Sequence, residues 1–180
     1  EGVEIMIRGD DGSSMPPNQV GEILFKSKVV MKGYWDNKQA TDKAIRDNWF
    51  HTGDAGYLDE EGFLFIHDRV KDMIISGGEN VYSAEVENAL YQHPAVDTCA
   101  VIGIPHEKWG EQVHAVVHLV PGHTANEQEL IDHSHTLIAS FKCPRSVSFL
   151  EDALPLSGAG KILKNDLRKP YWAEQTKSVS

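Results

Sequence analysis

The chain has 180 residues, of which 41% are hydrophobic and 24% are charged, and this balance is typical of folded globular domains rather than of disordered segments. Its formal net charge of −10 argues against a nucleic-acid partner and a polybasic membrane anchor, because both interactions require clustered Lys and Arg. No apolar run approaches the length of a membrane span, and the first residues lack the pattern of a signal peptide.

The first part of the chain is predicted to contain strands and one short helix. It begins without an initiating Met and almost at once in a strand-like run over 3–8, which indicates a fragment of a longer protein. A second alternating run over 21–28 predicts another strand. The apolar spacing over 38–47 favours a short helix that Asn37 could cap, and we expect the aromatic pair at 34–35 to be structural.

The stretch 49–80 carries many of the residues suited to chemistry. It includes Thr-Gly-Asp at 52–54, interpreted as a turn whose carboxylate could accept hydrogen bonds from a vicinal diol such as a ribose. Two short strands follow, joined by a turn that ends at Gly62. A joint at 68–72 with four charges in five residues then leads, through an apolar run, to the glycine loop 76–80. The pattern predicts a hairpin, a polar joint and a second hairpin.

The second half of the chain is predicted to begin with a helix and two strands. The helix is expected over 83–93, with Ser83 as its cap. Runs over 96–104 and 112–120 predict an antiparallel strand pair with a long connection. Cys99, one of only two cysteines, lies in the first of these runs and is expected to be a reduced core thiol, which fits a cytoplasmic protein.

Three further elements complete the predicted architecture. A helix over 126–140 opens on a capping-box pattern, a strand covers 146–150, and a short helix over 163–169 ends at Pro170, before a polar tail. This half is therefore α+β, with a small, mostly antiparallel sheet and packed helices. Four histidines are expected on the surface rather than at a metal: His114, His118, His133 and His135.

The order of the motifs resembles that of the adenylate-forming enzymes, which include acyl-CoA synthetases, the adenylation domains of peptide synthetases and firefly luciferase. In chain order the motifs are GEIL (21–24) with GYW (33–35), TGD (52–54), DRVKD (68–72), SGGEN (76–80) and LPLSGAGKIL (154–163). Trp-Gly-Glu at 109–111 resembles acyl-CoA synthetases in particular. The chain departs mildly from the family pattern at Ser83, where proline is frequent, and at Lys164, where arginine is common.

The resemblance implies two domains. Residues 1–68 would form the small distorted β-barrel that completes a large N-terminal domain, and residues 69–180 would form a mobile C-terminal domain. The family's Ser/Thr/Gly-rich phosphate loop and its acyl pocket lie upstream of these motifs, and nothing in this sequence matches that loop. The missing N-terminal domain of the same chain is therefore an expected partner, and the fragment alone is expected to be inactive.

The resemblance also assigns site residues. Lys161 is expected to be the catalytic residue, because a cation between an attacking carboxylate and the α-phosphate offsets the repulsion of two anions most strongly in the transition state. Asp54 is expected to bind the ribose hydroxyls of ATP, and Arg69 to reach ribose or phosphate oxygens. The ordinary alternatives are a surface lysine, a turn aspartate bonded to its own backbone, and a salt bridge at a strand end.

Lys71 matches the family's hinge position, about which the C-terminal domain rotates between two half-reactions. The rotation would withdraw Lys161 once the adenylate has formed. It would also bring the hairpin that contains Gly77, Gly78 and Glu79 to the active site, where the glycines let a pantetheine arm pass close to the backbone. The ordinary alternative for the two glycines is a tight turn.

The activity implied is that of an ATP-dependent acyl-CoA synthetase, as in fatty acid metabolism. A carboxylic acid and ATP would give an acyl-adenylate and pyrophosphate, and CoA would then displace AMP to give a thioester. Mg²⁺ is implied by the charge of the leaving pyrophosphate, although no metal ligand is identifiable. Two alternatives stay open, an adenylation domain that loads a carrier protein and a non-catalytic binding module. The acyl chain is not predictable, because the pocket that selects it is absent from this sequence.

Overall fold

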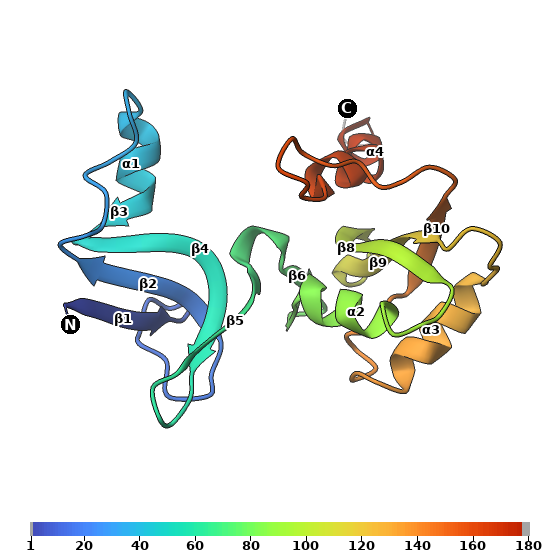
Figure 1. The fold of residues 1–180 in the computed structure, drawn as a ribbon, viewed down its shortest axis with the longest axis horizontal. Coiled ribbons are helices and arrows are strands. Elements are labelled where there is room, and N and C mark those ends of the chain that lie inside the picture. Colours follow the sequence, from blue (N-terminus) through green and yellow to red (C-terminus); the bar gives the residue numbers. More distant parts are fainter. Residues whose placement is uncertain (1, 178–180) are drawn as a thin grey trace. The chain divides into compact units, whose positions relative to one another are not determined.

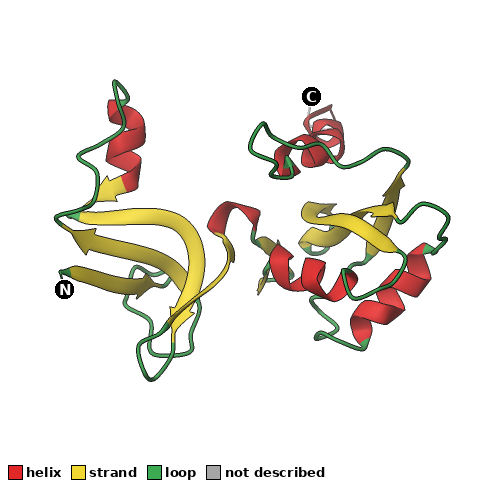
Figure 2. Ribbon diagram, viewed as in Figure 1, coloured by secondary structure: helices red, strands yellow, loops and turns green. Residues whose placement is uncertain are grey.

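The computed structural model describes residues 2–177, and the chain divides into two compact units, Glu1–Lys71 and Asp72–Ser180. Each unit is built on one sheet with helices beside it (Figure 1, Figure 2). Among the described residues, no helix is both long enough and apolar enough to cross a membrane.

The first unit is a five-stranded antiparallel sheet with one short helix. Its elements are β1 (Val3–Arg8), β2 (Gly21–Ser27), α1 (Lys38–Ala44), β3 (Ile45–Arg46), β4 (Trp49–Leu58) and β5 (Leu64–Arg69). Neighbouring strands follow the order β1-β2-β4-β3, and β5 pairs with β4. β4 has 10 residues and curves strongly (Figure 2). The expected strands at 3–8 and 21–28 are confirmed.

The Thr-Gly-Asp segment lies inside β4, so its interpretation as a turn is wrong. Gly53 has φ +72, and the register between β4 and β5 shifts between Ala55 and Gly56, so an irregular strand bends here without ending. A Cβ on Gly56 would lie 2.2 Å from the carbonyl oxygen of Phe65. The two strands can approach this closely because glycine has no side chain. Glycines that shape this bulge interrupt the apolar alternation, and the sequence pattern therefore resembled a turn.

The helix α1 begins as predicted and ends early. The Asn37 side chain accepts a hydrogen bond from the Ala40 N–H at 2.9 Å, which confirms the cap. Ile45 has an extended backbone and opens β3, so the helix stops three residues before the predicted end. Tyr34 is 48% exposed and Trp35 is 98% exposed, so the packing role expected of this pair is not found within the described residues.

The second unit has a central sheet with helices on both faces. A 3-10 turn, Val70–Asp72, leads into it. Its elements are β6 (Ile74–Ser76), β7 (Glu79–Val81), α2 (Ser83–Leu90), β8 (Val96–His106), β9 (Gly110–Leu119), α3 (Glu127–His135), β10 (Ser146–Leu150) and α4 (Lys164–Lys177). β9 pairs antiparallel with β6 and β8 and parallel with β10, so the predicted α+β unit with a mostly antiparallel sheet is confirmed.

Strand alternation divides the core of this unit into two layers. The larger layer packs α2 and α3 against one sheet face and contains Ile74, Val81, Val86, Leu90, Val96, Cys99, Val101, Val113, Ala115, Val117 and Leu130. The smaller layer lies on the other face, where Ile102, Ile104 and Val116 contact Leu167 and Tyr171 of α4. Cys99 is a free, buried thiol as predicted, and burial, with a smaller contribution from Glu87, raises its pKa to about 12.

Several element ends differ from the predictions. β8 and β9 extend to His106 and Gly110, so a short turn replaces the long connection. α3 has the predicted capping box but ends at His135 rather than at 140. α4 continues through Pro170 instead of ending there. Pro170 removes one helical hydrogen bond, yet the next residues dock on the sheet, where the Trp172 indole N–H donates to the Gly103 carbonyl at 3.1 Å.

His114 is buried, with 3% exposure, so its expected place on the surface is wrong. Its Nδ1 lies 2.7 Å from Ser146 Oγ, and its Nε2 lies 2.9 Å from the Tyr171 hydroxyl. Burial lowers the pKa of His114 to about 4, against a smaller opposing effect of Glu127. The buried imidazole is therefore neutral near pH 7 and links β9 to β10 and α4.

We expect the second unit to lose stability as the pH falls from about 6.5 to about 4. In that window the unfolded chain binds a proton at His114 that the folded chain does not, so the free energy of unfolding decreases, by up to about 3 kcal/mol. Urea unfolding followed by the amide signals of β9 measures this. A His114→Gln variant should show a shallower dependence on pH, and an identical slope in both proteins would contradict the assignment.

Candidate functional site

Asp54 and Arg69 face each other across the β4–β5 pair. They are register partners, and Arg69 Nε lies 3.2 Å from Asp54 Oδ1. The side chains are 36% and 52% exposed, respectively. Thr52 Oγ1 accepts the Asp54 N–H at 3.0 Å and donates to the Ile23 carbonyl at 2.8 Å, which anchors the backbone at this point. The structure therefore places a carboxylate and a guanidinium side by side, open to solvent.

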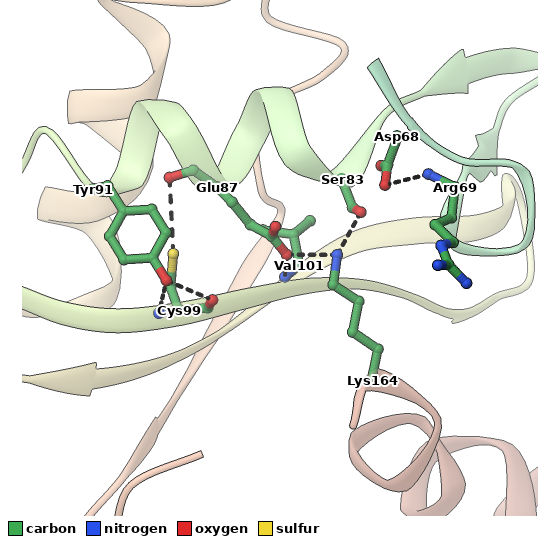
Figure 3. A network of polar contacts seen from close by, with 8 residues as sticks. All are labelled: Asp68, Arg69, Ser83, Glu87, Tyr91, Cys99, Val101 and Lys164. Carbon is green, nitrogen blue, oxygen red and sulfur yellow. Dashed lines mark hydrogen bonds and ion pairs between the residues drawn. The ribbon is translucent and has the colours of Figure 1, made fainter. Parts of the chain in front are cut away.

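The salt bridge anticipated as the ordinary alternative for Arg69 is thus present. An ion pair this exposed contributes about 0–1 kcal/mol, so a ligand can replace it at little cost. The Arg69 backbone N–H also donates to Asp68 Oδ1 at 2.7 Å (Figure 3). Lys71 is exposed in the 3-10 turn that follows, and the division between the two units falls directly after it.

The glycine hairpin of the second unit is a two-residue turn between β6 and β7. Gly77 has φ +63 and Gly78 has φ +88, the pair of positive angles that this tight turn requires. The Gly77 N–H donates to the Trp109 carbonyl at 2.9 Å. A Cβ on Gly77 would lie 2.7 Å from Trp109 Cε3, whereas one on Gly78 would meet nothing within 4 Å. The tight turn expected as the ordinary alternative is therefore observed. Gly77 of this turn packs against the Trp109 indole.

Two cations flank that indole. Lys108 Nζ lies 4.5 Å and Arg145 Cζ lies 4.9 Å from the Trp109 ring centroid. Arg145 is brought here by its backbone N–H, which donates to the Val113 carbonyl of β9 at 2.9 Å. Sequence reasoning missed Arg145, because it belongs to none of the motifs and only the parallel pairing of β10 with β9 brings it near Trp109. The arrangement is a cationic, aromatic surface next to the glycine hairpin.

Glu111 holds the hairpin on the sheet. Its Oε2 accepts the Ile75 N–H at 3.1 Å, and β6 pairs with β9 at Ser76 and Gly110. The carboxylate lies against Gly103, where a Cβ would come within 2.7 Å of Oε2. The Trp-Gly-Glu segment therefore accepts hydrogen bonds from two backbone N–H groups of the hairpin, at Ile75 and Gly77.

Lys161 lies on a closed turn and its side chain is exposed. The Ser157 N–H donates to the Lys161 carbonyl at 2.7 Å, and the Lys161 N–H donates to Ser157 Oγ at 3.1 Å. Leu156 and Ile162 form a β-bridge at the base of the turn, and Gly160 supplies φ +75. Hydrogen bonds to the backbone therefore close the glycine-rich loop that carries Lys161.

No cluster of three or more metal-ligating side chains occurs within residues 2–177. The structure brings Asp54 to Arg69 in the first unit, and Gly77 to Trp109 in the second. Glu79 is exposed at the start of β7, beside these glycines. The acid–guanidinium pair, the glycine hairpin and the lysine on a closed turn lie at the positions that the resemblance to the adenylate-forming enzymes nominated.

The comparisons with known proteins agree. Residues 85–161 match the AMP-binding enzyme C-terminal domain, as the resemblance predicts. It is 46% identical over 168 residues to a feruloyl-CoA synthase from Amycolatopsis sp, covering 93% of this chain and 34% of that protein. It is 41% identical over 179 residues to a fatty acid–[acyl-carrier-protein] ligase from Streptomyces coeruleorubidus, covering 99% of this chain and 34% of that protein.

A solved structure shows the same fold. The o-succinylbenzoate CoA synthetase from Bacillus subtilis, in complex with its acyl-adenylate intermediate, aligns with a TM-score of 0.84 and 42% identity over 92% of this chain and 34% of that one. The predicted fold class and the resemblance to adenylate-forming enzymes are thus confirmed. The chain spans about a third of the length of the relatives that it matches.

Proposed function

We propose that this chain is the C-terminal part of an ATP-dependent acyl-CoA synthetase. A carboxylic acid would attack the α-phosphate of ATP and release pyrophosphate, and the CoA thiol would then displace AMP from the acyl-adenylate to give a thioester. The observation that supports this most strongly is the match over more than nine-tenths of the chain to ligases that activate carboxylic acids. Fatty acids are one candidate substrate class, and the buried free thiols fit a cytoplasmic location.

We further propose that residues 1–68 complete an N-terminal domain and that residues 69–180 form the moving domain, with Lys71 as the hinge. The structure divides directly after Lys71, three residues beyond this boundary, which supports a joint in this part of the chain. The exposed 3-10 turn at Val70–Asp72 is short, so a change of a few backbone angles there would reorient two units that each keep their own sheet.

Asp54 and Arg69 fit the ATP ribose. The carboxylate can accept two hydroxyl hydrogens, and the guanidinium beside it can donate to ribose or phosphate oxygens. Lys161 would stabilise the charge that develops when two anionic groups approach, and its closed turn limits the reorganisation needed. Mg²⁺, when bound, would neutralise the leaving pyrophosphate. The described residues hold no group of three or more metal-ligating side chains, so no protein ligand is assigned to this ion.

The hairpin with Gly77, Gly78 and Glu79 is the proposed acceptor site. CoA carries an adenine ring and several phosphate groups. An indole with Lys108 and Arg145 nearby suits both features, because aromatic rings stack on bases and cations pair with phosphates. The open side of Gly78 leaves room for an extended pantetheine arm. A carrier protein delivers the same arm, and the relative from Streptomyces coeruleorubidus makes that acceptor the second candidate.

The test is pyrophosphate release by the full-length protein that contains this chain, given ATP, Mg²⁺ and a panel of carboxylic acids. We expect release with one class of acid, and CoA should convert it to steady turnover with formation of a thioester. Turnover with a carrier protein that bears a free pantetheine thiol, but not with CoA, would favour the second candidate. If none of the acids supports pyrophosphate release, both the acyl-CoA synthetase and the carrier-loading candidates are contradicted, and the non-catalytic module is left.

A further inference from the structure

We propose that the ion pair between Glu87 and Lys164 positions the Lys161 turn, and that adenylation depends on this pair while thioester formation does not. The inference rests on the proposed role of Lys161 as the residue that stabilises the adenylation transition state. It assigns a positioning function to two side chains that lie outside the site described above.

The pair joins two helices through a largely buried contact. Lys164 is the first residue of α4, and its Nζ lies 2.7 Å from Glu87 Oε1 on α2 (Figure 3). The same ammonium donates to Ser83 Oγ at 2.6 Å. The Ser83 side chain thus binds the first residue of α4, whereas the sequence predicted that it would cap α2. The Lys164 and Glu87 side chains are only 15% and 16% exposed. Solvent therefore screens this interaction much less than it screens a surface pair.

Glu87 is itself held by the sheet. Its Oε1 accepts the Val101 backbone N–H at 2.7 Å. One helical turn further on, the Tyr91 hydroxyl lies 3.3 Å from both the backbone N and the carbonyl O of Cys99 (Figure 3). Two alternate residues of β8 thus bind Glu87 on α2 and Tyr91 at the C-terminal cap of this helix, one turn apart. Lys164 is therefore attached to a rigid helix–strand pair and not to a movable surface group.

Only two residues separate Lys164 from Lys161. The first, Ile162, closes the base of the turn by its bridge to Leu156, and the second, Leu163, donates its N–H to the Pro155 carbonyl at 2.8 Å. The position of Lys164, the first residue of α4, therefore determines the position of the turn that carries Lys161. Two further polar contacts of α4, made by Tyr171 and Trp172, lie about two helical turns further along.

Helix stability alone does not account for a lysine here. The first turn of a helix carries partial positive charge, so a cation at its first residue is unfavourable. Placed there, Lys164 needs the Glu87 carboxylate to offset both this repulsion and its own burial. The Lys164–Glu87 ion pair therefore joins α4 to α2 and does not stabilise the N-terminus of α4 as a helix cap would.

The test compares the two half-reactions in the full-length protein. Glu87→Gln and Lys164→Met should each lower the single-turnover rate of acid-dependent pyrophosphate release by about 10- to 100-fold, since displacements of about 1 Å have effects of this size. Thioester formation from supplied acyl-adenylate and CoA should stay within about twofold, because Lys161 takes no part in it. Lys164→Arg should restore adenylation, because a guanidinium can reach the same carboxylate.

Glu85→Gln is the matched control. Glu85 lies on the same helix and pairs with Lys142 at 2.7 Å, an ion pair that does not involve α4, so adenylation should be unchanged. If a single variant does not fold, the double variant Glu87→Gln/Lys164→Met removes both charges and leaves no buried ion unpaired, and it should still adenylate slowly.

Two results would overturn the inference while the unmodified protein releases pyrophosphate normally. One is normal adenylation in the Glu87 and Lys164 variants, and the other is an equal loss in both half-reactions, which would show general destabilisation. Absence of release by the unmodified protein with every acid would instead contradict the proposed function.

Discussion

Replacing Lys161 by alanine in the full-length protein will lower the rate of acid-dependent pyrophosphate release by about 10²- to 10³-fold. The lysine is exposed at the tip of a turn whose backbone is closed by hydrogen bonds, so its ammonium can approach a ligand without reordering the chain. Adenylation brings a carboxylate onto a charged phosphorus, and a fixed cation helps most where that charge is crowded, in the transition state. The loss should therefore appear in kcat more than in KM for ATP.

The measurement is single-turnover pyrophosphate release, with thioester formation from supplied acyl-adenylate as the internal reference. That second step should be unchanged. Lys169→Ala is the control, because Lys169 is also exposed near the start of α4 but pairs with Asp166. Normal adenylation by the Lys161 variant, or an equal loss in the Lys169 variant, would refute a catalytic role.

Gly77→Ala will impair the use of CoA by about tenfold or more relative to Gly78→Ala. Both glycines have positive φ, so both substitutions introduce similar backbone strain. Only the Cβ at Gly77 collides with a neighbour, at 2.7 Å from Trp109 Cε3. Overpacking of this kind costs about 1–3 kcal/mol, and its relief would move the indole away from Lys108 and Arg145. The pair of variants therefore separates the effect of the indole from that of the turn.

The quantity to measure is kcat/KM for CoA, together with pyrophosphate release in its absence. Release without CoA should be similar in both variants, because Lys161 and the Asp54–Arg69 pair are elsewhere in the chain. Equal effects of the two substitutions on CoA use would show that the indole is irrelevant to the acceptor. A larger effect at Gly78 would show that contact between the arm and that glycine matters more than the position of the indole.

Local sequence signals predicted well wherever the structure depends on neighbours in the chain. The Asn37 cap and the capping box at the start of α3 were predicted correctly, since each is a contact among residues three apart. The β8 and β9 runs and the core position of Cys99 followed from apolar patterning. The order of the motifs was sufficient to indicate the family and to nominate Lys161, Asp54, Arg69 and the glycine hairpin.

Contacts between distant segments accounted for the errors. The bend of β4 at Thr-Gly-Asp depends on the register with β5, and α4 passes Pro170 because Tyr171 and Trp172 find partners on the sheet. His114 looked like a surface residue on an alternating strand, yet a helix from the end of the chain covers it. None of these partners is visible in a window of neighbouring residues.

Local periodicity and motif order thus predict the fold class and most of the elements, and they nominate residues for the chemistry. How those residues are held depends on contacts that form only when the chain folds. Arg145 reaches Trp109 through the parallel pairing of β10 with β9, and Lys164 reaches Glu87 through the packing of α4 on the sheet. The physical reason is that such contacts join segments far apart in the chain, and their energies depend on burial and distance that exist only after folding.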